Sequence, residues 1–339
     1  MQHANKNTVL GDFDNTEYNA DGITSRFFTR DGTYWINTDG ADGELRDFEI
    51  RYTFGIRPLQ QYLVEFPDGR MQALRIAWDT RPESAGGQRW IHLYPDEVIV
   101  AGDLLHWTGS QQNWNYMCAD CHSTNLVKAY DSETNTFNTG WSEINVGCES
   151  CHGPGRQHLT WTALDDSLKQ ADPGMGLSHL LRDRKNISWT IDPDSGNAVR
   201  SQPANENHEI DVCAACHSRR GQLREGIESS GSFLDYYRPA LLSQDLYHAD
   251  GQILDEVYVW GSFAQSKMKA AGVSCSDCHD PHSGKLRAQQ EQVCSQCHLV
   301  SKYATSQHHG HELDSTGANC LECHMPETCL LYTSPSPRD

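Results

Sequence analysis

Positive charge is scarce in this chain of 339 residues. It has 27 Lys and Arg residues against 46 Asp and Glu residues, which gives a formal net charge of −19. A protein that binds nucleic acid needs a basic surface to neutralise phosphates, so the composition argues against such a partner. An acidic surface keeps a protein soluble and can also steer a small cationic redox partner, and both interpretations stay open.

Long apolar runs are also missing. No stretch is apolar over the roughly 20 residues that a membrane-spanning helix needs, so we expect no transmembrane segment here. The first twenty residues, MQHANKNTVLGDFDNTEYNA, contain neither the apolar region nor the cleavage site of a secretory signal. Hydrophobic residues make up only 37% of the sequence, which is thin for the core of a protein of this length.

Cysteine, in contrast, is abundant and regularly placed. Of the 13 cysteines, 12 lie in six copies of the pattern Cys-x-x-Cys-His, far more copies than random placement would give. The cysteine pairs are Cys118 and Cys121, Cys148 and Cys151, Cys213 and Cys216, Cys275 and Cys278, Cys294 and Cys297, and Cys320 and Cys323. The histidines that follow them are His122, His152, His217, His279, His298 and His324.

Three kinds of site use closely spaced cysteines. Zinc is bound by pairs of Cys-x-x-Cys, but it does not require a histidine directly after every pair. A disulfide within Cys-x-x-Cys closes a very small loop, which stabilises little and leaves the histidine unexplained. Covalent c-type haem explains both features, because two thiols bind the porphyrin and the next residue supplies the proximal nitrogen to iron. The sequence therefore predicts six c-type haems, with zinc and disulfides as the less favoured alternatives.

The spacing of the motifs predicts a densely packed haem region. From Cys118 to His324 there is about one motif per 35 residues, so neighbouring haems must pack against one another. Six large apolar porphyrins would also supply the interior that the side chains lack. We expect short helices and loops there rather than long regular elements.

The fold class predicted from these patterns is α+β with little regular structure. Residues 1–97 are expected to form a small antiparallel β region, because SRFFTRDGTYWINT has a turn at Asp31 and Gly32 and QQYLVEFPDGRMQALRIAW alternates around Pro67. DFEIRYTF and RWIHLYP add two strand candidates. Residues 98–328 are expected to form the multihaem domain, with helices over residues 261–272 and 285–298 and hairpins within residues 127–141 and 189–199.

Both ends of the chain look truncated in the sequence. The last eleven residues, CLLYTSPSPRD (329–339), resemble the translation of a sequencing adapter, and a natural Ser/Pro-rich tail is the alternative. On the adapter interpretation Cys329, the thirteenth cysteine, is not biological. Haem c is attached outside the cytoplasmic membrane, so we expect a periplasmic or extracellular protein whose signal peptide is absent from this fragment.

Several sequence segments together resemble one known family. NWNYMCADCHSTNL, WSEINVGCESCHGPGRQH, VCAACHSRR, LYHADGQILDEVY, GVSCSDCHDPHSGKL and CLECHMPE are similar to the multihaem cytochromes c of the cytochrome c554 and c-prime group. The resemblance runs over about residues 1–327 and is strongest to the branch with C-terminal tetratricopeptide repeats. It implies a further haem motif and a signal peptide before residue 1, and another motif and the repeats after the end.

The second axial ligand decides what each haem can do, because an iron with two protein ligands shuttles electrons and an open iron can bind a substrate. Eleven histidines lie outside the motifs. The candidate distal ligands are His282, His158, His308, His309, His311, His248, His208, His106 and His92, and less favoured ones are His3, His179, Met117, Met268 and Met325. For each of them the alternative is an ordinary surface or core residue.

Local sequence favours some of these candidates. His282 follows His279 by three residues, which is too close to reach the other face of the same haem, so it is placed for a neighbouring haem. His158 follows a Gly-Pro-Gly turn that can redirect the chain. The cluster of His308, His309 and His311 is expected to supply one ligand.

The sequence favours an electron-transfer protein over an enzyme. Its expected partners are other redox proteins or quinol-linked electron donors and acceptors, and its oligomeric state is not predicted. The alternative is a multihaem oxidoreductase acting on nitrite, hydroxylamine or a sulfur compound through one open haem, at Cys148/Cys151 beside Arg156 or at Cys118/Cys121 beside Tyr116. No Cys-x-x-Cys-Lys motif, which relatives with that chemistry often use, occurs here. A scaffold with structural haems is a third, less favoured possibility.

Overall fold

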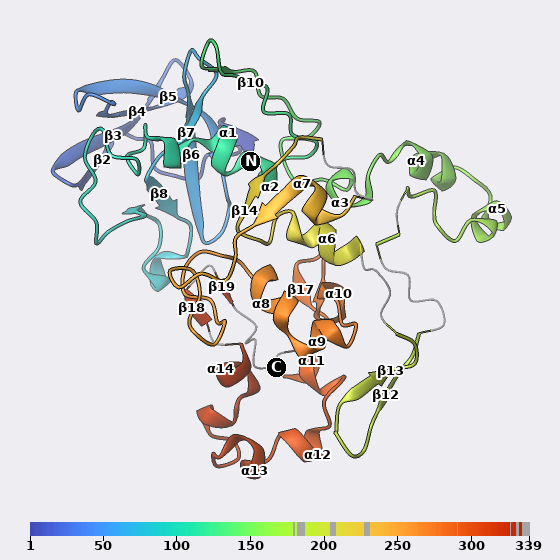
Figure 1. Cartoon of the computed structure of the whole chain (residues 1–339). Helices are drawn as coiled ribbons and strands as arrows, with labels where there is room; N and C mark the ends of the chain where they lie inside the picture. The colour runs from blue at the N-terminus through green and yellow to red at the C-terminus, as the bar shows by residue number, and fades with distance from the viewer. Residues whose placement is uncertain are drawn as a thin grey trace. The chain divides into compact units, whose positions relative to one another are not determined.

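The computed structural model describes residues 1–178, 180–181, 187–203, 208–226, 231–289, 291–325, 327–329 and 332–333. The chain divides into two compact units, Met1–Ser150 and Cys151–Asp339, and each is described by itself. One unit contains a large antiparallel sheet and the other is built from short helices and loops, so the α+β prediction is confirmed (Figure 1). Among the described residues, no helix has the length and apolar character needed to cross a bilayer.

The first unit is organised around one antiparallel sheet, drawn in blue to cyan in Figure 1. Its strands follow one another in the order β2-β3-β4-β5-β6-β8-β9, with β1 paired to β5 and β7 to β6. The bounds are β1 (Gln2–His3), β2 (Thr16–Ala20), β3 (Ile23–Arg30), β4 (Thr33–Asp39), β5 (Leu45–Phe54), β6 (Leu59–Glu65), β7 (Met71–Ala73), β8 (Ile76–Asp79) and β9 (Arg89–His92).

The expected turn between two of these strands is present. Arg30 of β3 is opposite Thr33 of β4, so Asp31 and Gly32 form a two-residue hairpin turn. Both have positive φ, 50° at Asp31 and 79° at Gly32, as a turn compatible with the twist of a sheet requires. Asp and Gly tolerate that conformation better than most residues. The turn predicted at this Asp-Gly pair is therefore present.

Aromatic side chains form the core of this unit. The rings of Phe27 and Trp90 are stacked, with centroids 3.6 Å apart and planes 10° from parallel. Phe13 meets both rings edge-on, at centroid distances of 5.5 Å. Tyr62 is buried beside them, and its hydroxyl donates to Gln60 Oε1 at 2.9 Å and accepts from the Gly11 amide at 2.9 Å. The buried Tyr62 hydroxyl is therefore satisfied within the unit, as a donor and as an acceptor.

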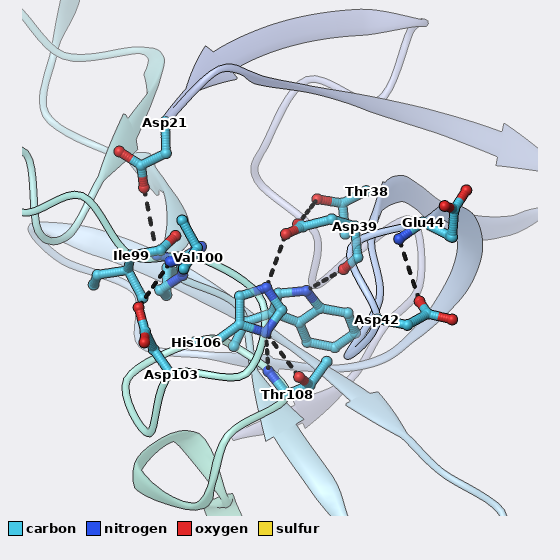
Figure 2. A network of polar contacts seen from close by, with 12 residues as sticks. Asp21, Thr38, Asp39, Asp42, Glu44, Ile99, Val100, Asp103, His106 and Thr108 are labelled. Atoms are coloured by element: carbon cyan, nitrogen blue, oxygen red, sulfur yellow. Dashed lines mark hydrogen bonds and ion pairs between the residues drawn. The ribbon is translucent and has the colours of Figure 1, made fainter.

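A buried polar network joins the loop after β9 to the end of β4 (Figure 2). His106 is fully buried, and its Nε2 donates to the Asp39 carboxylate at 2.9 Å while its Nδ1 accepts from the Thr108 hydroxyl at 2.7 Å. Trp107 Nε1 donates to the Asp39 carbonyl at 2.7 Å. Burial by itself raises the pKa of Asp39, but the hydrogen bond and charge of His106, together with Thr38 and Arg75, outweigh burial and lower it.

Beyond the sheet, the first unit continues in short elements. They are η1 (Glu83–Ala85), η2 (Ser110–Gln112), α1 (Trp114–Met117), α2 (Ala119–His122), β10 (Tyr130–Asp131) and β11 (Thr136–Phe137). Strands β10 and β11 pair as the hairpin expected within residues 127–141. Asn113 begins α1, where its side chain accepts a hydrogen bond from the Tyr116 amide, and this cap places the following Cys118 at the start of α2.

The second unit consists of short helices and small hairpins. Its helices are α4 (Arg156–Thr162), α5 (Asp166–Ala171), α6 (His208–Ala214), α7 (Phe233–Tyr236), α8 (Trp260–Gln265), α9 (Lys267–Ala270), α10 (Cys275–Cys278), α11 (Gln292–Ser295), α12 (Val300–Tyr303), α13 (Ser306–His309), η3 (Thr316–Ala318) and α14 (Cys320–His324), and α3 (Glu149–His152) crosses the division. Its strands are β12 (Trp189–Ile191), β13 (Ala198–Arg200), β14 (Arg220–Gln222), β15 (Tyr237–Pro239), β16 (His279–Asp280), β17 (Lys285–Leu286), β18 (Glu327–Cys329) and β19 (Tyr332–Thr333).

Two local predictions for this unit are confirmed and one is partly wrong. The hairpin within residues 189–199 is β12–β13, and the helix over residues 261–272 is present as α8 and α9. The helix over residues 285–298 is wrong at its start, because Lys285 and Leu286 pair with Asp280 and His279 and the helix α11 begins only at Gln292. Pairing across the Gly284 turn outweighs the helical composition that follows. Of the adapter-like tail, only Cys329, Tyr332 and Thr333 are among the described residues.

Candidate haem-attachment sites

Each Cys-x-x-Cys-His motif lies on or beside one turn of helix. A turn of helix places residues i and i+3 on the same face, so the two cysteines of a motif point to the same side. The amides of Cys121, Cys216 and Cys297 donate to the carbonyls of the first cysteine of their motifs, at 3.2, 3.2 and 3.0 Å. The remaining motifs lie at α3, α10 and α14, with Cys148 just before α3 and His279 just after α10. This shared local form is what two thioether bonds to one porphyrin require.

Local caps stabilise these short helices. In α10, Ser274 and Asp277 form a capping box, in which each side chain bonds to the other residue's backbone. At the start of α14, the Asn319 side chain accepts from the Leu321 amide at 2.8 Å. A single helical turn is marginal by itself, so these caps contribute to holding the cysteines in place.

Two motif histidines face a second histidine at a separation that matches one iron atom. Metal–imidazole bonds are about 2 Å long, so two imidazoles on opposite sides of one iron have ring centroids about 6 Å apart. The rings of His152 and His282 have centroids 6.1 Å apart and are 11° from parallel. The rings of His308 and His324 have centroids 6.2 Å apart and are 10° from parallel. Both separations match that of two imidazoles that share one iron.

Among the described residues, a similar separation is found between two histidines that lie outside the motifs. His309 and His311 have ring centroids 6.2 Å apart, 17° from parallel, and the Nδ1 of His309 accepts a hydrogen bond from the His311 amide at 3.1 Å. Separation alone therefore does not identify a haem site. What distinguishes the other two pairs is that one partner in each directly follows two cysteines.

His158 is oriented in the way that metal-ligating histidines usually are. A ligating imidazole usually donates its second ring nitrogen to a carboxylate or a backbone carbonyl, which fixes its orientation. Nδ1 of His158 donates to the Met175 carbonyl at 2.7 Å, and the ring stacks on Trp161 at 5.7 Å. Nε2 is then the nitrogen with which this histidine would bind iron.

His298 has a similar anchor. Its Nδ1 donates to Oδ1 of Asn197 at 2.8 Å, and the Tyr303 hydroxyl donates to the same oxygen at 3.1 Å. Asn197 lies in the β12–β13 turn, so this hairpin orients a motif histidine about a hundred positions away in sequence. Sequence reasoning missed Asn197, because no local pattern connects it to His298.

Burial favours the neutral form of two motif histidines. The pKa of His122 is lowered by burial, and that of His217 by burial and by the neighbouring charge of His279. A neutral imidazole is the form that binds a metal. The ring of Phe54 packs edge-on against His122 with centroids 4.5 Å apart, which restricts the orientation of the imidazole.

The other candidate distal ligands lie in different surroundings. Both ring nitrogens of His106 are engaged in the network of Figure 2. His92 is buried against Asp21, and its Nδ1 accepts from the Tyr94 amide at 3.3 Å. His208 begins α6 and is exposed, as is His248. His179 lies outside the described residues.

Within the described residues, no three or more His, Cys, Asp and Glu side chains converge on a common metal position. A zinc site shared by two motifs would need such a group of four.

These features define a class of protein, the c-type cytochromes, in which cysteines attach haem and histidines bind its iron. The family model of cytochrome c554 and c-prime matches residues 103–153, a stretch that includes the first two motifs. This similarity supports a multihaem c-type cytochrome that binds haem c. No curated protein and no solved structure gives a significant match to the chain.

Proposed function

We propose that the protein transfers electrons through six covalently bound haems, in the periplasm or outside the cell. The observation that carries this proposal is the pairing of two motif histidines, His152 and His324, with a second histidine at the spacing of one iron atom. An iron held by two imidazoles has no open position, which suits electron transfer rather than substrate conversion. Other redox proteins or quinol-linked carriers would be its partners.

In this proposal the cysteines, the motif histidines and the distal histidines have different roles. The cysteines of each motif hold the porphyrin, and the following histidine binds iron from one side. His282, His308 and His158 are proposed as distal ligands, with His308 as the ligand from its cluster. We assign His106 and His92 to the buried polar contacts of the first unit instead. When bound, haem supplies reversible one-electron chemistry at iron.

The number of haems tests the proposal directly. The protein would be produced with a signal peptide in a host that attaches haem c, and its haem content measured by the pyridine haemochrome method. About six haems per chain are expected. Four or fewer would contradict the assignment of all six motifs.

A second candidate function is a reaction at one open haem. It is favoured by Lys128, which is buried and lies with its ammonium 4.6 Å from the centroid of the Tyr116 ring, close to Cys118 in sequence. A buried cation beside a haem could hold a small anion such as nitrite. Electron paramagnetic resonance of the oxidised protein separates the two functions, because only an open haem gives a high-spin signal that changes on adding nitrite.

The ligand within the cluster on α13 can be identified by substitution. His308→Ala is expected to open the position opposite His324 and to make about one haem in six high-spin. His309→Ala, one residue along the same helix, is the matched control and should leave every haem low-spin. The reverse pattern would assign the ligand to His309 instead.

A further inference from the structure

The second unit contains a buried carboxylate that the proposed electron transfer does not by itself explain. Glu209 lies on α6 four residues before Cys213, and only 5% of its surface is exposed. A buried carboxylate is costly unless hydrogen bonds replace its lost water. The hydrogen-bond donors around Glu209 are therefore the groups that stabilise it in the interior.

The bonds to this carboxylate come from the segment around another haem motif. Glu209 accepts from the Ser276 amide at 2.6 Å, from the Ser276 hydroxyl at 2.8 Å and from the Ser274 hydroxyl at 3.2 Å. Both serines flank Cys275, the first cysteine of its motif. Bonds to an ionised acceptor are among the stronger ones in proteins, so Glu209 ties α6 to α10.

This tie brings the first cysteines of two motifs together. Before haem is attached, the contact of the Cys213 thiol with Cys275, burial and the charge of Glu209 raise the pKa of Cys213. The charge of Glu209 also acts on Cys275. One carboxylate is thus within electrostatic reach of both attachment points.

We propose that Glu209 positions the two haem-attachment segments at Cys213 and Cys275 against each other and lowers the reduction potentials of the two haems held there. This inference rests on the proposed function, since it requires haem at both motifs. A fixed negative charge stabilises the ferric form, which carries one more positive charge than the ferrous form, and burial leaves that interaction poorly screened. The pair would then be more reducing than it would be without Glu209.

The test is a redox titration of the six-haem protein, followed at the haem absorption bands. Glu209→Gln keeps the shape of the side chain and removes the charge, so two of the six haems are expected to titrate at higher potential while four stay in place. Glu209→Asp retains the charge and should restore part of the difference. Glu322→Gln is the matched control, because Glu322 is an exposed carboxylate inside a haem motif and water screens its charge.

The outcomes separate this inference from the proposed function. Six haems with unchanged potentials in Glu209→Gln would overturn the role of Glu209 and leave electron transfer intact. If the variant carries fewer haems, peptide mass mapping decides: loss confined to the motifs of Cys213 and Cys275 supports the positioning role, and loss elsewhere overturns it. A wild-type protein without haem at these two motifs would refute the proposed function itself.

Discussion

Replacing His282 with methionine is expected to raise the reduction potential of one haem and to leave the others near their wild-type values. The ring of His282 lies parallel to that of His152 with 6.1 Å between centroids, so the substitution would exchange one axial imidazole for a thioether. A thioether ligand stabilises ferrous iron relative to imidazole, which moves the potential upward. A redox titration that resolves the individual haems measures the change.

Two further variants sharpen this test. His282→Ala removes the ligand altogether and should convert about one haem in six from low-spin to high-spin in electron paramagnetic resonance. His3→Met, at an exposed histidine of β1, is the control and should change no potential. If His282→Met changes no potential either, His282 is not a ligand and the pairing with His152 is coincidental.

Asp39→Ala is expected to cause the largest loss of stability of the substitutions considered. Removing Asp39 leaves the fully buried His106 without the acceptor of its Nε2, and a buried donor left without its acceptor typically costs about 1–3 kcal/mol. Chemical denaturation of the haem-loaded protein, followed by far-ultraviolet circular dichroism, measures the loss. Asp42 lies three residues after Asp39 and forms an exposed ion pair with Arg46, so Asp42→Asn is the control and should have little effect.

The effect of Asp39→Ala should also depend on pH in a defined direction. The pKa of Asp39 is lower in the folded protein than the usual aspartate value. A carboxylate with a lowered pKa contributes its stability in full above the unfolded value of about 3.9 and loses it as the pH falls through the folded value. The wild type and the variant should therefore differ fully at pH 7 and converge below about pH 4. A difference that persists unchanged in acid would show that packing, and not the charge, dominates.

The elements that were predicted well are those whose signals are local. The hairpin at Asp31 and Gly32 depends on two residues that tolerate positive φ, and the structure shows both in that conformation. The six motifs can be recognised from the sequence because haem attachment requires a fixed spacing within five residues. In residues 285–298, by contrast, helical composition competed with pairing of Lys285 to Asp280, and a neighbouring strand decided the outcome.

In the candidate site too, local sequence predicted the residue types, and contacts between distant residues were visible only in the structure. The sequence predicted that His282 serves a haem other than that of its own motif, but it could not show that the His282 ring lies beside that of His152. Glu209 lies one turn before Cys213 and thus on the same face of α6, yet its bonds to Ser274 and Ser276 cross more than sixty positions. His106 was a ligand candidate by its presence in the sequence alone, and its contacts with Asp39 and Thr108 are visible only in the folded chain.

By itself the sequence determined the Cys-x-x-Cys-His motifs with their histidines, the acidic character and the β-rich beginning. Covalent attachment is a local requirement that five consecutive residues meet, so it can be read without a fold. The tertiary structure decided which histidines face each other, which carboxylate is buried between two motifs and which histidine belongs to the core. Those facts depend on distances between residues far apart in the chain, and such distances exist only after the chain has folded.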